Sequence, residues 1–143
     1  MKTSILFMCL LTVAYVTTDL VGLKTLCYNI YECAKKLKKC GNLVIDPLTD
    51  IFVWDCALRR VNVINEKNEV IRENGIKYCE DVMLYKKNVD SCKCKVANCI
   101  DKECKNLKPI PKYNKEVYCQ INCIIKEGVM SNIDCNMYNC SNK

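Results

Sequence analysis

The density of cysteine constrains this chain more than any other feature. Fourteen of its 143 residues are cysteines, and all but Cys9 follow Gly22. Such density is typical of exported proteins, in which an oxidising environment keeps thiols paired as disulfides. The candidate disulfide cysteines are Cys27, Cys33, Cys40, Cys56, Cys79, Cys92, Cys94, Cys99, Cys104, Cys119, Cys123, Cys135 and Cys140. Because this number is odd, one cysteine should stay unpaired, either as a buried free thiol or as the link of a disulfide-linked homodimer.

Residues 1–22 have the form of a secretory signal peptide. Lys2 precedes an apolar run from Ile5 to Val16. At about 12 residues this run is shorter than the about 20 residues that span a membrane, and it suits the apolar part of a signal peptide. Small residues place the cleavage between residues 18 and 22. We therefore expect a secreted, extracellular protein with a single disulfide-stabilised domain over residues 23–143.

The remaining chain is expected to be mainly α-helical. Apolar residues recur at spacings of three and four over residues 23–40, which is the period of one helix face, and Gly41 is a natural stop. Asp46-Pro47 has the form of a helix start, with Asp46 as the N-cap, although the β-branched run 51–53 could also form a strand. Another helix is expected from Asn114 to Gly128, and no linker divides the chain.

The segment 61–79 is open to two interpretations. Asn74-Gly75 lies between short runs of β-prone residues, which favours a β-hairpin with a type I′ turn. Alternatively, a helix over Glu66 to Glu73 ends at the same dipeptide. Further on, a short helix is expected over Glu80–Lys87 and a longer one from Asp90-Ser91 to Leu107. The expected fold is thus a small, mainly α, disulfide-rich domain, or an α+β domain if the hairpin near residues 61–79 forms.

Several function classes are excluded by residues that the chain lacks. It contains no histidine, which removes the Ser-His-Asp and Cys-His nucleophile systems and histidine-ligated zinc hydrolysis. We therefore expect a protein that is not an enzyme and has no cofactor. The Cys92-x-Cys94 pair with Cys99 and Cys104 has the density of a thiolate metal site, but an exported chain would oxidise these thiols, so no metal is expected. The net charge of +6 comes mostly from lysine, without the arginine clusters of nucleic-acid readers, so no nucleic acid is expected as a partner.

A basic cluster near the end of the first helix is the candidate target contact. It contains the lysines of residues 35–39, with two tyrosines nearby on the same helix: Tyr28, Tyr31, Lys35, Lys36, Lys38 and Lys39. Basic residues beside aromatic ones suit an acidic surface of a membrane protein such as an ion channel. The simpler interpretation of the same residues is a solvated helix end.

The leader Met1 to Thr18 and the cysteine pattern Cys27, Cys33, Cys40, Cys56 onward resemble the cysteine-rich venom proteins of arthropods, and most nearly the scoloptoxin group of centipedes. The resemblance implies secretion into venom and action on ion channels or other extracellular targets. We therefore predict a secreted, toxin-like effector.

Two other functions stay open. One is a carrier of small apolar ligands, similar to the helical, disulfide-linked odorant-binding proteins. The early three-residue cysteine gap of those proteins occurs here only late, between Cys119 and Cys123. The other is a protease inhibitor, for which Lys108-Pro109-Ile110-Pro111-Lys112 would be the exposed loop.

Overall fold

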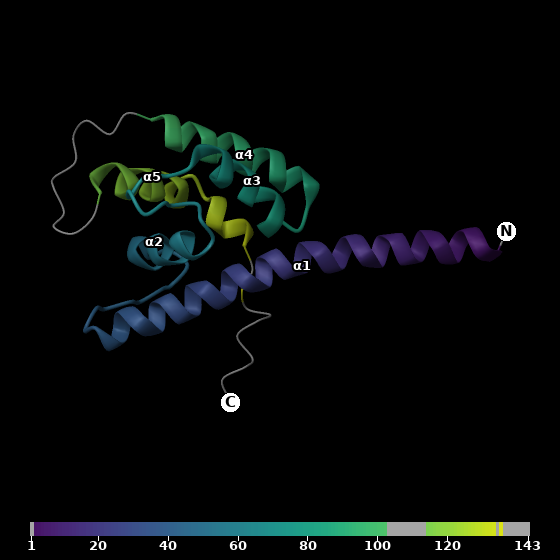
Figure 1. The fold of residues 1–143 in the computed structure, drawn as a ribbon, viewed down its shortest axis with the longest axis horizontal. Helices are drawn as coiled ribbons and strands as arrows, with labels where there is room; N and C mark the ends of the chain where they lie inside the picture. The colour runs from purple at the N-terminus through teal and green to yellow at the C-terminus, as the bar shows by residue number, and fades with distance from the viewer. Residues whose placement is uncertain (1, 103–113, 134, 136–143) are drawn as a thin grey trace.

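The computed structural model of the protein describes residues 2–102, 114–133 and 135, with side chains from residue 21 onward. These residues form five α-helices and one short 3-10 helix: α1 (Lys2–Lys39), α2 (Ile51–Arg60), α3 (Arg72–Val82), α4 (Lys86–Asp101), α5 (Lys115–Lys126) and η1 (Val129–Asn132). The first half of α1 projects beyond the other helices, which lie on one side of its second half (Figure 1). The predicted signal peptide lies within this first half, and its cleavage stays a prediction.

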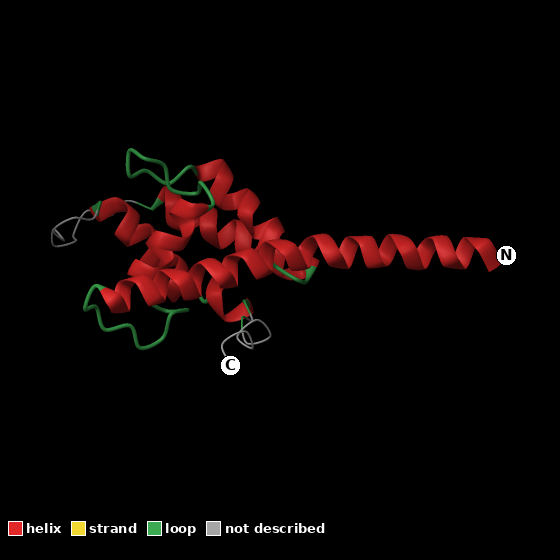
Figure 2. Ribbon diagram, turned by 60° about the horizontal axis from the view of Figure 1, so that its bottom comes forward, coloured by secondary structure: helices red, strands yellow, loops and turns green. Residues whose placement is uncertain are grey.

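The prediction of a mainly α, disulfide-rich domain is confirmed. Helices and loops make up the described part of the chain, and its one β element is an isolated antiparallel bridge between Ile64 and Val70 (Figure 2). The turn of this bridge runs from Asn65 to Glu69, whose backbones hydrogen-bond at 3.0 Å. Asn68 makes the turn possible because asparagine tolerates the positive φ of 61° found there.

The prediction of a hairpin around Asn74-Gly75 is wrong, and so is the alternative prediction of a helix over residues 66–73. Asn74 and Gly75 lie in the first turn of α3. Gly75 is buried, and a Cβ atom there would lie 3.2 Å from Ile100 Cδ1 on α4. The glycine therefore serves close packing of two helices rather than a turn, and the Asn74 side chain donates a hydrogen bond to the Asn62 carbonyl (2.8 Å).

The second helix begins four residues later than Asp46-Pro47 predicts. Asp50 is the N-cap of α2, and its carboxylate accepts hydrogen bonds from the amides of Phe52 (2.9 Å) and Val53 (3.0 Å). Asp46 instead stabilises the preceding turn by accepting from the Leu48 amide (3.0 Å). Two aspartates with the same capping chemistry compete here, and Asp50 lies directly before the residues that pack on the core.

The boundaries of the middle helices also differ from prediction. A short helix over 80–87 is wrong, because α3 ends at Val82 and α4 begins at Lys86. Asp90-Ser91 lies inside α4 rather than at its start, and Tyr85 is an N-cap without a side-chain hydrogen bond. The helix end predicted near Leu107 lies outside the described residues. By contrast, Asn114 caps α5 as predicted, accepting a hydrogen bond from the Glu116 amide (2.9 Å).

Disulfides join the helices around one hydrophobic core. Cys27–Cys135 links α1 to the end of the described chain, and Cys33–Cys56 links α1 to α2. Cys79–Cys92 joins α3 to α4, and Cys99–Cys123 joins α4 to α5. The largest fully buried side chain is that of Trp54, whose indole N–H donates to the Leu48 carbonyl (2.8 Å). A modest apolar core is thus supplemented by covalent links, as small secreted domains require.

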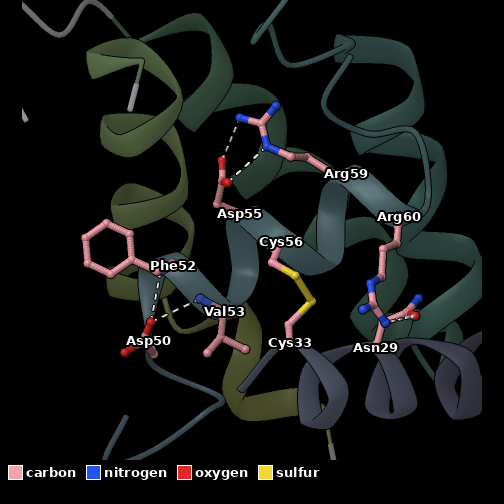
Figure 3. The surroundings of a disulfide bond; sticks show 9 residues. All are labelled: Asn29, Cys33, Asp50, Phe52, Val53, Asp55, Cys56, Arg59 and Arg60. Atoms are coloured by element: carbon pink, nitrogen blue, oxygen red, sulfur yellow. Dashed lines mark hydrogen bonds and ion pairs between the residues drawn. A yellow bond between two sulfur atoms is a disulfide. The ribbon is translucent and has the colours of Figure 1, made fainter. Parts of the chain in front are cut away.

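The junction of α1 and α2 shows how such a link is supported (Figure 3). Next to the Cys33–Cys56 bond, Arg60 of α2 donates a hydrogen bond to Asn29 of α1 (3.5 Å). On α2 itself, Arg59 holds the largely buried Asp55 carboxylate through two bonds of 3.0 Å. The buried charge is therefore paired, and the polar contacts reinforce the disulfide instead of weakening the core.

Candidate functional site

An apolar cavity of about 50 Å³ lies at the centre of the molecule. All five helices contribute to its wall, and so does η1. Among the lining residues are Leu26 from α1, Trp54 from α2, Val82 from α3, Val96 from α4, Ile121 from α5 and Met130 from η1. Because each helix turns one apolar face inward, their convergence produces this space without any one segment encoding it.

The wall combines rigid and deformable parts. The Cys79–Cys92 disulfide lies in it and holds α3 against α4. Met83 and Met130 also line the cavity, and both are almost completely buried. Methionine side chains are flexible and adapt to the shape of a neighbour, so the cavity can change shape at these two residues while its covalent frame stays in place.

Two of the residues that line the cavity each carry a polar atom without a hydrogen-bond partner within the described part of the chain. These atoms are the hydroxyl of Tyr78 and Oε1 of Gln120, and both are buried. Gln120 Nε2 donates to the Ile100 carbonyl (3.1 Å), which fixes the orientation of the amide and turns Oε1 away from that bond. Burial raises the pKa of Tyr78, and the nearby Asp81 carboxylate raises it further, so the hydroxyl keeps its proton at neutral pH.

A wider groove of about 330 Å³ adjoins the cavity. The two spaces share Val70, Ile100 and Gln120 in their walls, and the carboxylate residues Glu69 and Glu116 lie at the groove. Gln120 therefore stands between the apolar interior and a polar surface groove, although it is itself only 4% exposed.

Neither Tyr78 nor Gln120 is predicted from the sequence as a site residue. For Gln120 a signal existed: Val117, Ile121 and Ile124 form the buried face of α5, and Gln120 interrupts this apolar face at helical spacing. A polar residue in such a position is unusual and calls for a partner. Tyr78 carries no comparable signal, because only the packing of α3 decides that its hydroxyl is buried.

The predicted target contact is found at the C-terminal end of α1. All four lysines, Lys35, Lys36, Lys38 and Lys39, are exposed, and Lys35 forms an ion pair with Glu32 (3.4 Å). Tyr28 is 63% exposed on the same helix. Tyr31 differs, because it is partly buried and packs against the core, so it offers less surface to a partner.

The candidate cysteines divide into two groups. Eight form the four disulfides above, and Cys119 is also disulfide-bonded. Cys40 and Cys94 are free and exposed. Cys104 and Cys140 lie outside the described residues, as does the loop Lys108–Lys112 that would serve a protease inhibitor.

The part of the chain that the structure describes holds no group of three or more histidine, cysteine or acidic residues placed to bind a metal ion. None of its helices is both long and apolar enough to cross a membrane.

Comparison with known proteins places the chain in a family, although no protein-family model matches it. It is 34% identical to venom allergen 2 of Solenopsis saevissima over 132 residues, which cover 90% of this chain and 93% of that protein. The chain belongs to the venom allergen 2 family. It is also 32% identical to venom allergen 2 of Solenopsis richteri over 114 residues (78% of this chain, 92% of that protein). Venom allergen 4 of Solenopsis geminata is 28% identical over 132 residues (91% and 93%).

Membership of the venom allergen 2 family bears on two predictions. It confirms a venom-related protein, and together with the disulfides it supports secretion. The relatives come from fire ants, so the resemblance to the centipede scoloptoxin group is not supported. Neither "venom" nor "allergen" in these names states a molecular target.

Proposed function

We propose that the protein is a secreted carrier of small apolar ligands and not an enzyme. The observation that carries this proposal is the central cavity, whose wall is apolar except at Tyr78 and Gln120. Concave, mostly apolar spaces with a few polar groups are the usual form of sites for small molecules. The disulfide frame supports the proposal, because it preserves the helix arrangement while a ligand occupies the centre.

The size of the cavity defines what such a ligand must do. Its volume of about 50 Å³ is well below the roughly 150 Å³ of an engineered apolar cavity that binds benzene. A ligand larger than a few atoms must therefore move part of the wall, and Met83 and Met130 are the side chains best suited to give way. We expect slender, flexible ligands to bind more tightly than broad, rigid ones such as aromatic probes, which should still bind in the micromolar range.

Displacement of the fluorescent apolar probe N-phenylnaphthylamine tests the carrier function. The wild type should bind the probe saturably in the micromolar range. Val96→Phe, which fills the cavity, should abolish binding, whereas Leu84→Phe adds the same bulk at a partly exposed position outside the lining and should not. Both variants must keep wild-type helical circular dichroism. Wild-type protein without saturable binding would contradict the proposal.

A second candidate function is a toxin that binds a membrane protein such as an ion channel. The exposed cluster Lys35, Lys36, Lys38 and Lys39 favours it, since positive charge at one helix end complements an acidic channel surface. In recordings from sodium, potassium and calcium channels, changing these four lysines to glutamine should remove any block. The matched control changes four exposed lysines elsewhere, Lys67, Lys77, Lys86 and Lys126. Equal loss in both variants would mean that net charge alone matters.

We further infer that Cys40 joins two copies of the chain in a covalent homodimer. Its free thiol is exposed, and the neighbouring Leu43 and Ile45 are 85% and 86% exposed although both are large and apolar. A second copy would cover these side chains. Lys38 and Lys39 of the two copies would repel each other, so the dimer should depend on the disulfide and separate under reducing conditions.

Non-reducing electrophoresis tests the dimer directly. Cys40→Ser should run as a monomer, and Cys94→Ser, which removes the second exposed free thiol of the described residues, should still dimerise. A monomer band for the wild type would exclude the inference.

A further inference from the structure

Two residues that line the cavity carry buried polar groups that the carrier function by itself does not explain. A buried polar atom without a partner is unfavourable, because it has lost its hydrogen bonds to water and gained none in return. Buried polar groups in native proteins are nearly always paired. Within the described residues, Tyr78 Oη and Gln120 Oε1 have no hydrogen-bond partner, and both atoms belong to residues that line the same cavity. A molecule that enters the cavity and moves its wall could supply the missing partners.

The chemistry of these two groups restricts that molecule. Gln120 Oε1 can only accept a hydrogen bond, and the amide cannot flip without losing the bond from Nε2 to the Ile100 carbonyl. The Tyr78 hydroxyl is protonated at neutral pH, as tyrosine ordinarily is, and burial raises its pKa further, so it can donate. The ligand must then offer a donor to Gln120 and an acceptor to Tyr78.

Common polar groups of small molecules differ in how they meet this requirement. A hydroxyl both donates and accepts. An ether or ketone only accepts, so it leaves Gln120 unpaired. A carboxylate or an ammonium would bring a charge into an apolar interior, which is far less favourable than bringing in a neutral group. A neutral alcohol thus fits the wall best.

We propose that the carried ligand is a slender aliphatic alcohol whose hydroxyl donates to Gln120 Oε1 and accepts from the Tyr78 hydroxyl. This inference rests on the proposed carrier function and names its ligand class. Gln120 also lines the adjoining groove, so the hydroxyl end of the ligand lies toward the groove and the hydrocarbon chain extends among the apolar side chains.

Competition against bound N-phenylnaphthylamine tests the ligand class with molecules of matched size. n-Heptanol and n-hexyl methyl ether are isomers, and only the alcohol can donate. Heptanol should displace the probe at a concentration about tenfold lower than the ether, as one additional buried hydrogen bond implies. n-Heptane should compete less well than the ether, and heptanoate should be the weakest competitor.

Two variants assign the hydrogen bonds to their residues. Gln120→Met, which keeps the length of the side chain, should remove the preference for heptanol over the ether. Tyr78→Phe should weaken the competition by heptanol and by the ether by the same factor, about five- to tenfold, and leave the competition by heptane unchanged. Tyr118→Phe removes a hydroxyl from a residue of α5 outside the cavity lining and is the matched control.

The outcomes separate this inference from the carrier function. If the wild type binds no probe, the carrier function is wrong. If it binds the probe but heptanol and the ether compete equally, the carrier function stands and the alcohol class is wrong, as expected when water alone satisfies the two polar atoms. Because the wild-type series decides this point, a variant that fails to fold does not leave the inference undecided.

Discussion

Cys33 lies on α1 and Cys40 directly follows the last residue of that helix, yet the two cysteines differ in burial and in bonding. Cys33 is fully buried and bonded to Cys56 of α2, whereas Cys40 is exposed and free. Their spacing along the helix predicts the same face for both. The difference comes from what covers each side chain: Cys33 lies under α2, and Cys40 faces solvent beside the turn at Gly41.

The same contrast separates two regions of the molecule. The braced body consists of residues 23–34 of α1 together with the later helices, and it encloses the cavity. The exposed end, residues 35–45, carries the four lysines, Cys40 and two solvent-facing aliphatic side chains around the buried Val44. We therefore expect substitutions in the body to affect stability and the proposed ligand binding, and substitutions in the exposed end to affect the proposed contacts with partners.

Among the disulfides of the described residues, removing the one that links the most distant positions in the sequence should destabilise the body most. Cys27–Cys135 spans 108 residues and Cys79–Cys92 only 13. In the chain-entropy description, the double alanine variant of the first pair should lower the free energy of unfolding by about 4–5 kcal/mol, and that of the second by about 3 kcal/mol. Urea denaturation measures both. A larger loss from the short link would show that native contacts, not chain entropy, decide the effect.

Alkaline pH should reveal the buried hydroxyl of the body. The folded protein holds the proton of Tyr78 to higher pH than the unfolded chain, which releases it near pH 10. The stabilisation is complete below pH 10 and is lost as the pH rises above it, by about 1.4 kcal/mol at pH 11. Tyr78→Phe should remove this part of the pH dependence of the unfolding free energy. Tyr28→Phe, on the exposed surface of α1, is the matched control and should not remove it.

The N-cap of α2 should matter less. Asp50→Ala removes the acceptor for two backbone amides and should lower the free energy of unfolding by about 1 kcal/mol. Asp46→Ala removes an acceptor in an exposed turn and should have less than half that effect. Thermal unfolding compares the two variants, and equal losses would mean that both aspartates stabilise the start of α2.

The smallest effect on stability should come from the exposed end. Cys40→Ser breaks no bond within the chain and should change the unfolding free energy by less than about 0.5 kcal/mol, measured in reductant for both proteins. A larger loss would show that Cys40 contributes to the body, which would remove the distinction between the two regions.

The sequence predicted correctly those helices that are specified by local features, which are interactions between residues a few positions apart. The period of residues 23–40 and the cap at Asn114 are such features, and both correspond to the observed structure. The predictions failed where a residue serves a distant neighbour. Gly75 has the form of a turn residue, but it is buried against Ile100 of α4. Nothing within residues 61–79 indicates that Ile100, 25 positions further along the chain, packs so closely against residue 75 that glycine is favoured there.

Sequence by itself determined the class of this protein: its cysteines and its helical periods imply a disulfide-braced helical domain, because oxidation and periodicity depend only on residue type and spacing. Only the tertiary structure decided which cysteines pair, which remain free, and where the cavity lies. These properties depend on which side chains other helices cover. Tyr78 and Gln120 became candidate ligand contacts for the same reason. Water forms hydrogen bonds with any exposed polar atom, so only burial by packing can leave such an atom without a partner.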